Sequence, residues 1–140
     1  MNILILCTGN SCRSQMAEGF LKAFDSSLNV FSAGTLPSGE VHPKAIRVMK
    51  DLGIDLNKNH PKSVDQFIKS EFDYVITVCG GARESCPTFT GKVKNNIHIG
   101  FDDPADATGT EEEIMSEFIR IRNEILVDFF QFYHTNIKHK

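Results

Sequence analysis

NILILCTGNSCRSQMAEGFLKAF, residues 2–24, places a strand, a loop and a helix in direct succession, and this order decides the fold. Asn2–Leu6 is a short apolar run, as expected of a strand that is buried on both faces of a parallel sheet. From Ser14 to Phe24 the apolar residues recur at helical spacing. Cys7–Ser14 must therefore turn a buried strand into a helix.

Strands and helices continue to alternate along the rest of the chain. Three further strands are expected at Leu28–Ser32, Asp73–Val78 and Asn96–Phe101. Three further helices are indicated by residues typical of helix ends, namely Pro43 with Gly53, Ser63 with Gln66, and Thr110 with Glu113. The alternation predicts an α/β fold: a doubly wound parallel sheet of four strands with helices on both faces, in one domain over residues 1–140.

Composition and charge exclude several classes of protein. The 140 residues carry 15 basic and 18 acidic side chains, which are interspersed and give a net charge of −3. The sequence has no basic stripe for nucleic acid and no polybasic run for a membrane surface. No apolar stretch approaches the about 20 residues of a membrane span, and Met1 leads into a strand without the pattern of a signal peptide. We therefore expect a cytoplasmic monomer that binds neither nucleic acid nor membranes.

Four cysteines, at positions 7, 12, 79 and 86, allow three interpretations. Two structural disulfides require an oxidising compartment, for which the sequence gives no export signal. A zinc site is disfavoured because the sequence has no Cys-x2-Cys or His-x3–5-His pair, and we predict no metal site. Reactive thiols are the better interpretation in a reducing cytosol.

The loop Cys7–Ser14 has the composition of an anion-binding cradle. Gly9 and Asn10 tolerate positive φ, so the loop can curl and direct successive N–H groups inward. The positive end of the following helix adds to this field, and Arg13 can bind two oxygens of a tetrahedral dianion. The same field is expected to lower the pKa of Cys7, with Ser14 donating a hydrogen bond to the thiolate. A buried thiol beside a surface arginine is the simpler alternative.

Groups remote in sequence are expected to meet at one edge of the sheet. In open parallel sheets, ligands bind outside the carboxyl ends of the strands. Cys7 ends the first strand, Cys79 ends the third, and Asp102 and Asp103 follow the fourth. A carboxylic acid at this edge can protonate the oxygen that Cys7 displaces, although Asp and Pro are also common in solvated turns.

The loop CTGNSCRS at residues 7–14, followed by QMAEG, resembles the low-molecular-weight protein tyrosine phosphatase family. Within that family the chain is similar to the thioredoxin-coupled arsenate reductases. The similarity rests on SAG at Ser32–Gly34, VITVC at Val75–Cys79, a second cysteine followed by proline, and GFDDPA and GTEEE near the end. It covers essentially the whole chain.

The resemblance implies reduction of arsenate to arsenite by a relay of three thiols. Cys7 would attack arsenate, Cys79 would attack the sulfur of the Cys7 adduct, and Cys86 would take over the disulfide, which thioredoxin reduces. Asp103, directly before Pro104, would be the acid in preference to Asp102. The loop residues would bind arsenate, or phosphate or sulfate as mimics: Thr8, Gly9, Asn10, Ser11, Cys12, Arg13 and Ser14. Cys12 is otherwise expected to pack or shape the loop, with an off-pathway disulfide to Cys7 as the lesser alternative.

Two other functions stay open from the sequence. A phosphatase would hydrolyse phosphate monoesters through a Cys7 thiophosphate and would not need the other two thiols. The phosphatases of the resembled family carry aromatic residues after the Asp-Pro pair, whereas this chain continues Ala105-Asp106-Ala107. A redox-sensing module would bind the anion without useful turnover.

The spacing of Cys79 and Cys86 demands a rearrangement. Seven residues of regular helix separate two Cα atoms by about 10 Å, whereas a disulfide tolerates at most about 7 Å. Gly80 and Gly81 give the segment the freedom to unwind. We predict a redox-driven change in residues 80–85 that exposes the final disulfide to thioredoxin.

Potassium is the one ion that the resemblance raises, and no cofactor is expected to be required. Some relatives bind potassium behind the loop, at positions that match Asn10, Glu18 and Ser32. Their acidic ligand falls on Lys62 here, and an ammonium group can replace the ion electrostatically. We therefore expect activity to be insensitive to the exchange of potassium for sodium.

Overall fold

The computed structural model describes residues 1–138, so the last two residues of the predicted domain lie outside it. The strands are β1 (Asn2–Cys7), β2 (Asn29–Gly34), β3 (Phe72–Thr77) and β4 (Val93–His98). The α-helices are α1 (Arg13–Phe24), α2 (Pro43–Lys50), α3 (Gly80–Ser85) and α4 (Glu111–Asn136). Two short 3-10 helices, η1 (Val64–Gln66) and η2 (Pro104–Asp106), complete the elements.

The four strands form one parallel sheet in the order β2-β1-β3-β4, which confirms the predicted doubly wound sheet. The chain leaves β1 toward one edge to form β2 and then crosses to the other side of β1 to form β3. The point where the direction reverses lies between β1 and β3, and ligands of such sheets bind at the carboxyl ends of the strands there. Cys7 pairs with Gly34 across the β1–β2 ladder, and Leu6 pairs with Thr77 across the β1–β3 ladder.

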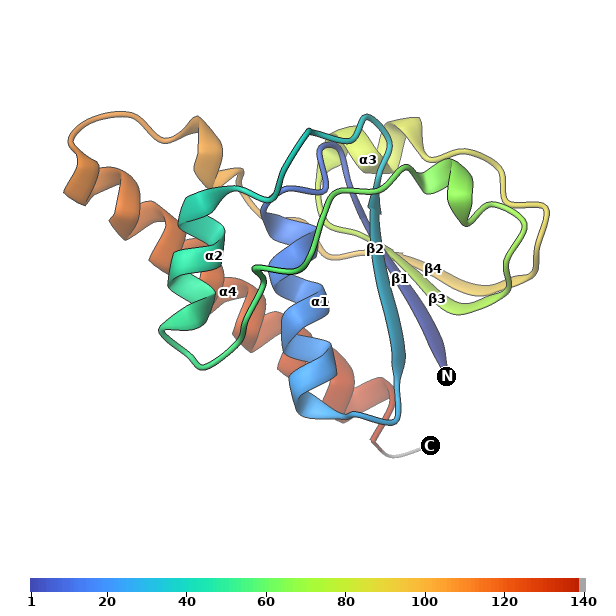
Figure 1. Ribbon diagram of the computed structural model, residues 1–140. Coiled ribbons are helices and arrows are strands. Elements are labelled where there is room, and N and C mark those ends of the chain that lie inside the picture. Colours follow the sequence, from blue (N-terminus) through green and yellow to red (C-terminus); the bar gives the residue numbers. More distant parts are fainter. Residues whose placement is uncertain (139–140) are drawn as a thin grey trace.

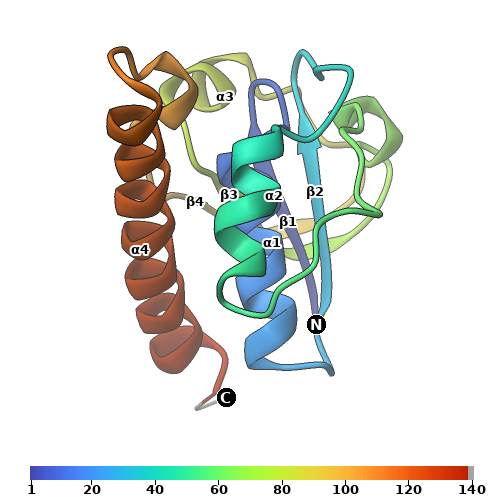
Figure 2. The same ribbon diagram turned by 60° about the vertical axis from the view of Figure 1, so that its left-hand side comes forward.

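The two faces of the sheet are covered unequally. Helices α1 and α4 lie together on one face, with α2 packed against α4 (Figures 1 and 2). On the other face, Phe67 follows η1 and packs against Phe31 and Phe72. The short helix α3 contacts β1 and β3 near their carboxyl ends. Helices thus lie on both faces as predicted, but the long ones share one face.

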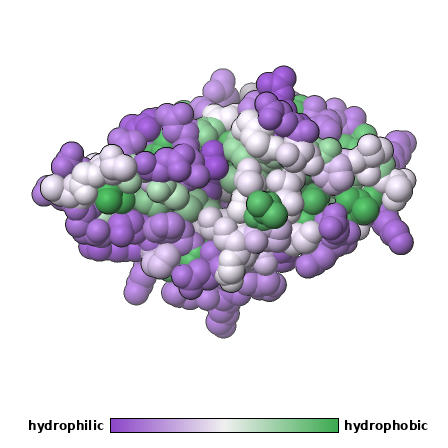
Figure 3. Space-filling view, turned by 90° about the horizontal axis from the view of Figure 1, so that it is seen from above, coloured by the Kyte–Doolittle hydropathy of each residue, from purple (hydrophilic) through white to green (hydrophobic). Residues whose placement is uncertain are grey.

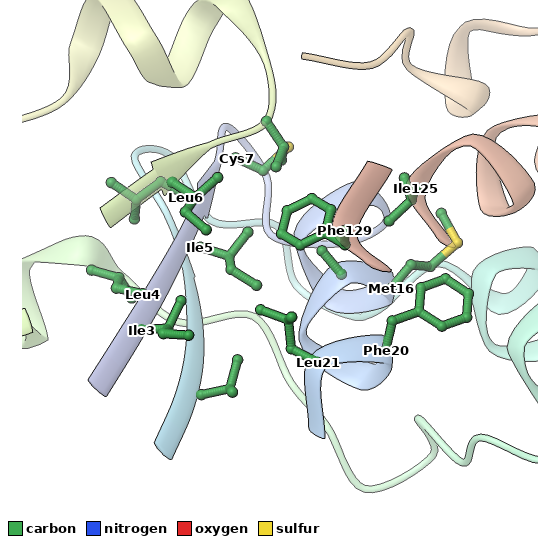
Figure 4. Packing of buried hydrophobic residues seen from close by; sticks show 14 of the residues in the cluster. Ile3, Leu4, Ile5, Leu6, Cys7, Met16, Phe20, Leu21, Ile125 and Phe129 are labelled. Carbon is green, nitrogen blue, oxygen red and sulfur yellow. The ribbon is translucent and has the colours of Figure 1, made fainter. Parts of the chain in front are cut away.

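The core lies between the central strand and the two long helices. Residues Ile3–Leu6 of β1 are completely buried, as the apolar run predicted. Their side chains alternate between the two faces, and those of Ile3 and Ile5 are directed toward α1 (Figure 4). Phe129 of α4 is directed toward the sheet, whereas Phe20 of α1 lies on the side of α1 turned away from the strands (Figure 4). A central strand with this burial gives Cys7, at its end, a fixed position.

Helix ends follow the predicted residues closely. Thr110 and Glu113 form a complete capping box at the start of α4, with each side chain accepting from the backbone of the other residue. Pro43 is the first residue of α2, and Gly53 has a φ of +79° beyond its end. Ser63 accepts a hydrogen bond from the Asp65 N–H and so caps the three-residue η1. The predicted reciprocal bond from the Gln66 side chain is not among the bonds of this cap.

The prediction for the fourth strand was displaced. The expected strand began at Asn96, whereas β4 spans Val93–His98. As an edge strand, β4 alternates between half-buried and exposed positions, so its sequence VKNNIH lacks an apolar run. The predicted strand included Ile99 and Phe101 because both are apolar. Their N–H groups do donate to the carbonyls of Thr77 and Val78 beyond the regular strand.

The helices of the structure also bear on membrane crossing. Over residues 1–138, none of the helices combines the length and the apolar character that a membrane span needs.

Candidate active site

The predicted site residues meet at the carboxyl edge of the sheet. Cys7 is the last residue of β1, and Cys79 lies two residues beyond the end of β3 and directly before α3. The loop between β1 and α1 lies at the same edge, at the top of Figure 1. Viewed from above, this edge is mostly polar or weakly polar, with hydrophobic residues in separate patches (Figure 3).

The carbonyl groups of Cys7–Cys12 all accept hydrogen bonds from donors that lie outside the concave side of the loop. Main-chain N–H groups hold five of them, at 2.9–3.1 Å: Thr35 to Cys7, Leu36 to Thr8, Ser38 to Gly9, His42 to Ser11 and Met16 to Cys12. The sixth carbonyl, that of Asn10, accepts from the side chain of Gln15 at 3.1 Å. In a trans peptide the N–H of the next residue points opposite to the carbonyl. Six carbonyls turned outward therefore direct six successive N–H groups inward.

Four of the inward N–H groups have no competing acceptor. Across the described residues, the N–H groups of Gly9–Cys12 donate to no carbonyl and no side chain. Such a set of convergent amides binds a tetrahedral anion, and the N-terminus of α1 adds its positive end. The predicted anion cradle is therefore present in the geometry of the loop.

Asn10 anchors the turn of the loop. Its φ of +53° is the left-handed conformation that the sequence analysis expected in this loop. Its buried side chain donates to Ser14 Oγ at 2.8 Å and to Ser32 Oγ at 2.9 Å, and it accepts from the Lys62 N–H at 3.0 Å. The structure records no bond from Ser14 to Cys7 among the residues it describes. Ser14 thus holds the loop instead of contacting the thiolate.

Gly34 lets β2 approach the loop closely. A Cβ at this position would lie 2.5 Å from the carbonyl oxygen of Thr8 and 3.2 Å from the N of Asn10. Both are backbone atoms that cannot move independently, so a larger residue would displace the loop. The close approach of the loop therefore explains why the SAG motif has glycine at position 34.

Arg13 has one donor that lacks a partner. Its Nη1 donates to the Phe101 carbonyl at 3.0 Å, and its Nη2 lies 3.4 Å from the Asp103 carboxylate. Its Nε is buried and has no hydrogen-bond partner. A buried donor without an acceptor is costly, and an oxyanion in the adjacent loop would remove this cost. The arginine side chain is itself nearly buried, so this charge is only weakly screened.

Cys7 and Cys79 lie near enough to affect each other's pKa at this edge of the sheet. The Cys7 thiol, the Thr8 hydroxyl at 3.3 Å and the Ala82 N–H at 3.3 Å lower the pKa of Cys79 to about 4. Cys79 and burial raise the pKa of Cys7, whereas Arg13 and the Thr8 N–H lower it. The loop therefore acts on Cys7 in the predicted direction, and the thiolate at Cys7 stays a prediction.

The other two thiols differ from this pair. Cys86 is half-buried at the end of α3, and burial raises its pKa. Cys12 is buried at the start of α1, where burial raises its pKa to about 12. All four cysteines are free thiols in this structure. Helix α3 separates Cys79 from Cys86, so a disulfide between them requires the helix to change shape, as predicted.

The two aspartates at the edge face different partners. Asp103 lies beside Arg13, and its Oδ1 caps η2 by accepting from the Ala105 N–H at 3.0 Å. Asp102 is exposed and lies 3.4 Å from Arg120 of α4. Asp103 is therefore directed toward the loop and Asp102 away from it, in the order that the sequence analysis chose.

The segment behind the loop, where the prediction on potassium falls, combines one carboxylate with two lysines. Glu18 is buried, accepts from Ser32 Oγ at 2.8 Å and forms an ion pair with Lys22 at 3.0 Å. The half-buried Lys62 adds a second cation nearby, and its ammonium group donates to the His60 carbonyl at 3.1 Å. Two ammonium groups beside one carboxylate leave no net negative charge for a cation. Within residues 1–138, no three His, Cys, Asp or Glu side chains are grouped as metal ligands.

Two contributors to the site escaped the sequence analysis. The sequence predicts Gln15 only as a residue of the helix, and it predicts no role for the segment from Thr35 to His42. The segment acts through its main-chain N–H groups, which no residue pattern reveals. Gln15 is a polar residue on a helix face that packs toward the core, and this contrast was the available signal.

Comparison with known proteins gives consistent results. Residues 2–134 match the family model described as low molecular weight phosphotyrosine protein phosphatase. An arsenate reductase from Halalkalibacterium halodurans is 47% identical over 124 residues, which cover 88% of each chain. A solved structure of an arsenate reductase in the phosphate binding state superposes with a TM-score of 0.80 at 28% identity, covering 95% of this chain and 96% of the other. A low molecular weight protein tyrosine phosphatase from Bacillus subtilis shares the fold, with a TM-score of 0.75 at 24% identity and coverage of 96% and 95%.

Proposed function

The chain belongs to the low molecular weight phosphotyrosine protein phosphatase family, and we propose that within it the protein is an arsenate reductase that uses Cys7, Cys79 and Cys86 in turn. The observation that carries this proposal is the position of Cys79 beside the anion loop: it follows the strand next to β1, and its Sγ lies 3.3 Å from the hydroxyl of Thr8, the neighbour of Cys7. Hydrolysis through Cys7 does not require a second thiol beside the nucleophile. Reduction requires one there.

The first step forms a bond between Cys7 sulfur and arsenic. The inward amides and Arg13 bind hydrogen arsenate, and Cys7 displaces its hydroxyl group in line. Cys7 reacts as a thiolate, and the proton that it gives up is, in the net balance, the one with which the hydroxyl group leaves as water. Asp103 lies beside Arg13 and is placed to deliver a proton to the leaving oxygen. Cys79 remains a thiolate throughout this step.

The second step reduces arsenic. The Cys79 thiolate attacks the sulfur of Cys7, a disulfide forms between them, and the sulfur–arsenic bond breaks. Its electron pair stays on arsenic, which changes from arsenic(V) to arsenic(III) and leaves as arsenite. The two sulfurs supply the two electrons.

The third step frees Cys7. Cys86 loses its proton and attacks the sulfur of Cys79, so that Cys7 leaves as a thiolate and a Cys79–Cys86 disulfide remains. Because α3 lies between these residues, the helix must unwind for the bond to form. Unwinding also brings the disulfide to the surface, where a dithiol of the thioredoxin class reduces it. We expect a cytoplasmic monomer, in keeping with free thiols that work as reductants.

The surroundings of the acid favour a small oxyanion over an aryl phosphate. After Asp103 the chain forms η2, where Ala105 and Asp106 are exposed. This helix presents no aromatic ring that would flank a phosphotyrosine side chain. The fold shared with the phosphatase from Bacillus subtilis keeps monoester hydrolysis as the second candidate.

Coupled turnover tests the proposal. The reduced protein is mixed with thioredoxin, thioredoxin reductase, NADPH and arsenate, and NADPH oxidation is followed. Wild type should turn over, whereas Cys79→Ser and Cys86→Ser should stop after at most one cycle. Aryl phosphate hydrolysis that survives both substitutions, without arsenate-dependent NADPH oxidation in wild type, would establish the phosphatase instead. Phosphate binding without either activity would identify an anion-sensing module.

A further inference from the structure

One carbonyl of the anion loop is held differently from the others. Five of the six outward carbonyls accept from main-chain N–H groups, which every residue except proline supplies. The carbonyl of Asn10 accepts from the Nε2 of Gln15 at 3.1 Å. Within the described chain, this is the loop carbonyl whose donor depends on the identity of a side chain.

The Gln15 amide has a single possible orientation. The side chain is completely buried. Its Nε2 also donates to the His60 carbonyl at 3.3 Å, and its Oε1 accepts from Asn59 Nδ2 at 3.1 Å. A flipped amide would place Oε1 against two carbonyl oxygens and its own Nε2 against the Asn59 Nδ2 donor, which the Glu18 carboxylate also binds at 3.4 Å. Asn59 therefore fixes which end of the amide faces the loop.

The peptide that Gln15 holds is the one that presents the Ser11 N–H. The Asn10 carbonyl and the Ser11 N–H belong to one planar unit, so an outward carbonyl means an inward N–H. Asn10 also adopts the left-handed conformation, which is uncommon for residues other than glycine although asparagine tolerates it better than most. Such a conformation persists where the surroundings hold it on several sides. The Gln15 side chain donates to the Asn10 carbonyl, and the Lys62 N–H donates to the Asn10 side chain.

We propose that Gln15 is a positioning residue for oxyanion binding: oriented by Asn59, it holds the Asn10–Ser11 peptide so that the Ser11 N–H faces the anion. The inference deepens the proposed function and rests on its anion loop. It names a residue outside the loop, on the first helical turn of α1, that sets affinity for tetrahedral oxyanions without contacting them.

The alternative role for Gln15 is to fill space in the core. That role predicts a loss of stability and no change in affinity of the folded protein. A Gln15→Met substitution keeps the length of the side chain and removes both hydrogen-bond donors. Gln15→Glu keeps the shape but places carboxylate oxygens opposite two carbonyl oxygens. Ile125→Val is the control, since it removes one buried methylene from α4, away from the loop.

The experiment measures the dissociation constant of inorganic phosphate on the reduced full-length protein by calorimetry, beside the melting temperature. Gln15→Met should weaken phosphate about tenfold, which corresponds to about 1.4 kcal/mol. Gln15→Glu should weaken it further, and Ile125→Val should lower the melting temperature without changing phosphate affinity. Values within twofold of wild type for both Gln15 variants would overturn the proposal.

Asn59→Ala provides a second route if the Gln15 variants do not fold. It leaves Gln15 in place but releases the orientation of its amide, so phosphate affinity should fall severalfold. Combined with Gln15→Met it should add little, because the two residues act through one peptide. Unchanged phosphate affinity in Asn59→Ala would count against the proposal. Arsenate turnover plays no part in these measurements, so a failure of the proposed reduction would be seen separately.

Discussion

At the scale of the residue, the low pKa of Cys79 has a direct chemical consequence. The thiolate is the reactive form of cysteine. Since Cys7, the Thr8 hydroxyl and the Ala82 N–H lower the pKa of Cys79, the pair keeps a thiolate far below neutral pH. Burial acts in the opposite direction on Cys86 and raises its pKa.

Alkylation against pH tests this difference. The rate of iodoacetamide labelling of the Cys7–Cys79 pair should stay nearly constant from pH 8 down to pH 5. It should fall only as the pH drops through the Cys79 pKa of about 4. Cys86 in the same sample should be labelled appreciably only at alkaline pH, which gives an internal control. Mass spectrometry of the labelled peptides separates the sites. Labelling of the pair that falls between pH 9 and pH 7, as for an ordinary thiol, would contradict the assignment.

Asp103 is the second residue whose role can be isolated. Replacement by asparagine keeps the shape and the cap of η2 but removes the proton donor. Turnover should fall by about 10²–10⁴-fold, the usual contribution of general acid catalysis. The limb of the pH–rate profile that reports the acid should disappear. Asp102→Asn is the matched control, because Asp102 faces Arg120 and should lose little activity. Equal effects of the two substitutions would remove Asp103 from the mechanism.

At the scale of the element, α3 joins the chemistry to a change of shape. Cys79 is the N-cap of this helix, since its sulfur accepts from the Ala82 N–H. A thiolate is a far better acceptor than a disulfide sulfur, so oxidation of Cys79 removes the cap. Loss of an N-cap costs a helix about 1 kcal/mol. Six residues of helix have little other stability, so the first disulfide prepares the unwinding that the second requires.

Gly80→Ala tests this coupling. Gly80 opens α3, and a Cβ there meets no atom within 4 Å, so alanine fits and favours the helix by up to about 1 kcal/mol. The Cys7–Cys79 disulfide should therefore accumulate, with its conversion to Cys79–Cys86 slowed by up to about fivefold. Acid quenching and mass mapping of the disulfides give the two rates. Gly39→Ala, also into open space but outside any helix, should leave both rates unchanged. Equal conversion rates in Gly80→Ala and wild type would show that α3 need not unwind.

Elements also show which parts of the fold were predictable. The strand, loop and helix of residues 2–24 have local signals: an apolar run, turn residues and helical spacing. The edge strand β4 has none, because Lys94, Asn96 and His98 face solvent, and its prediction was displaced. Cys7 and Cys79 follow neighbouring strands, so their common edge was predictable from the order of the elements, whereas their mutual effect on pKa depends on the folded structure. The outward carbonyls were unpredictable because main-chain donors carry no residue signature.

At the scale of the whole molecule, several segments meet behind the anion loop. Glu18 of α1 and Ser32 of β2 are hydrogen-bonded, and Lys62 lies between β2 and η1. Burial lowers the pKa of Lys62, while the Glu18 carboxylate acts in the opposite direction. We expect lysine ammonium groups to take the electrostatic role of a bound cation in this network.

Exchange of monovalent ions tests this arrangement. The melting temperature and the turnover should be the same in potassium and sodium chloride at equal ionic strength. Lys62→Asp reverses the charge beside Glu18, so it should lower stability, and potassium should then restore part of the loss. This variant shows that the assay detects an ion effect where one exists. A clear dependence of the wild-type protein on potassium would refute the prediction.

The pairing of β1 with β3 divides the proposed relay into two kinds of motion. Leu6 lies opposite Thr77, and Cys7 and Cys79 follow these residues at the carboxyl ends of two neighbouring strands, which a sheet holds about 4.8 Å apart. The third thiol lies across a helix that must first come apart. Solvent friction acts on segments that move through water and not on groups that the sheet already holds at one edge. In a viscous or crowded medium, arsenite would therefore be released at its usual speed, while the return of the enzyme to its starting state would slow.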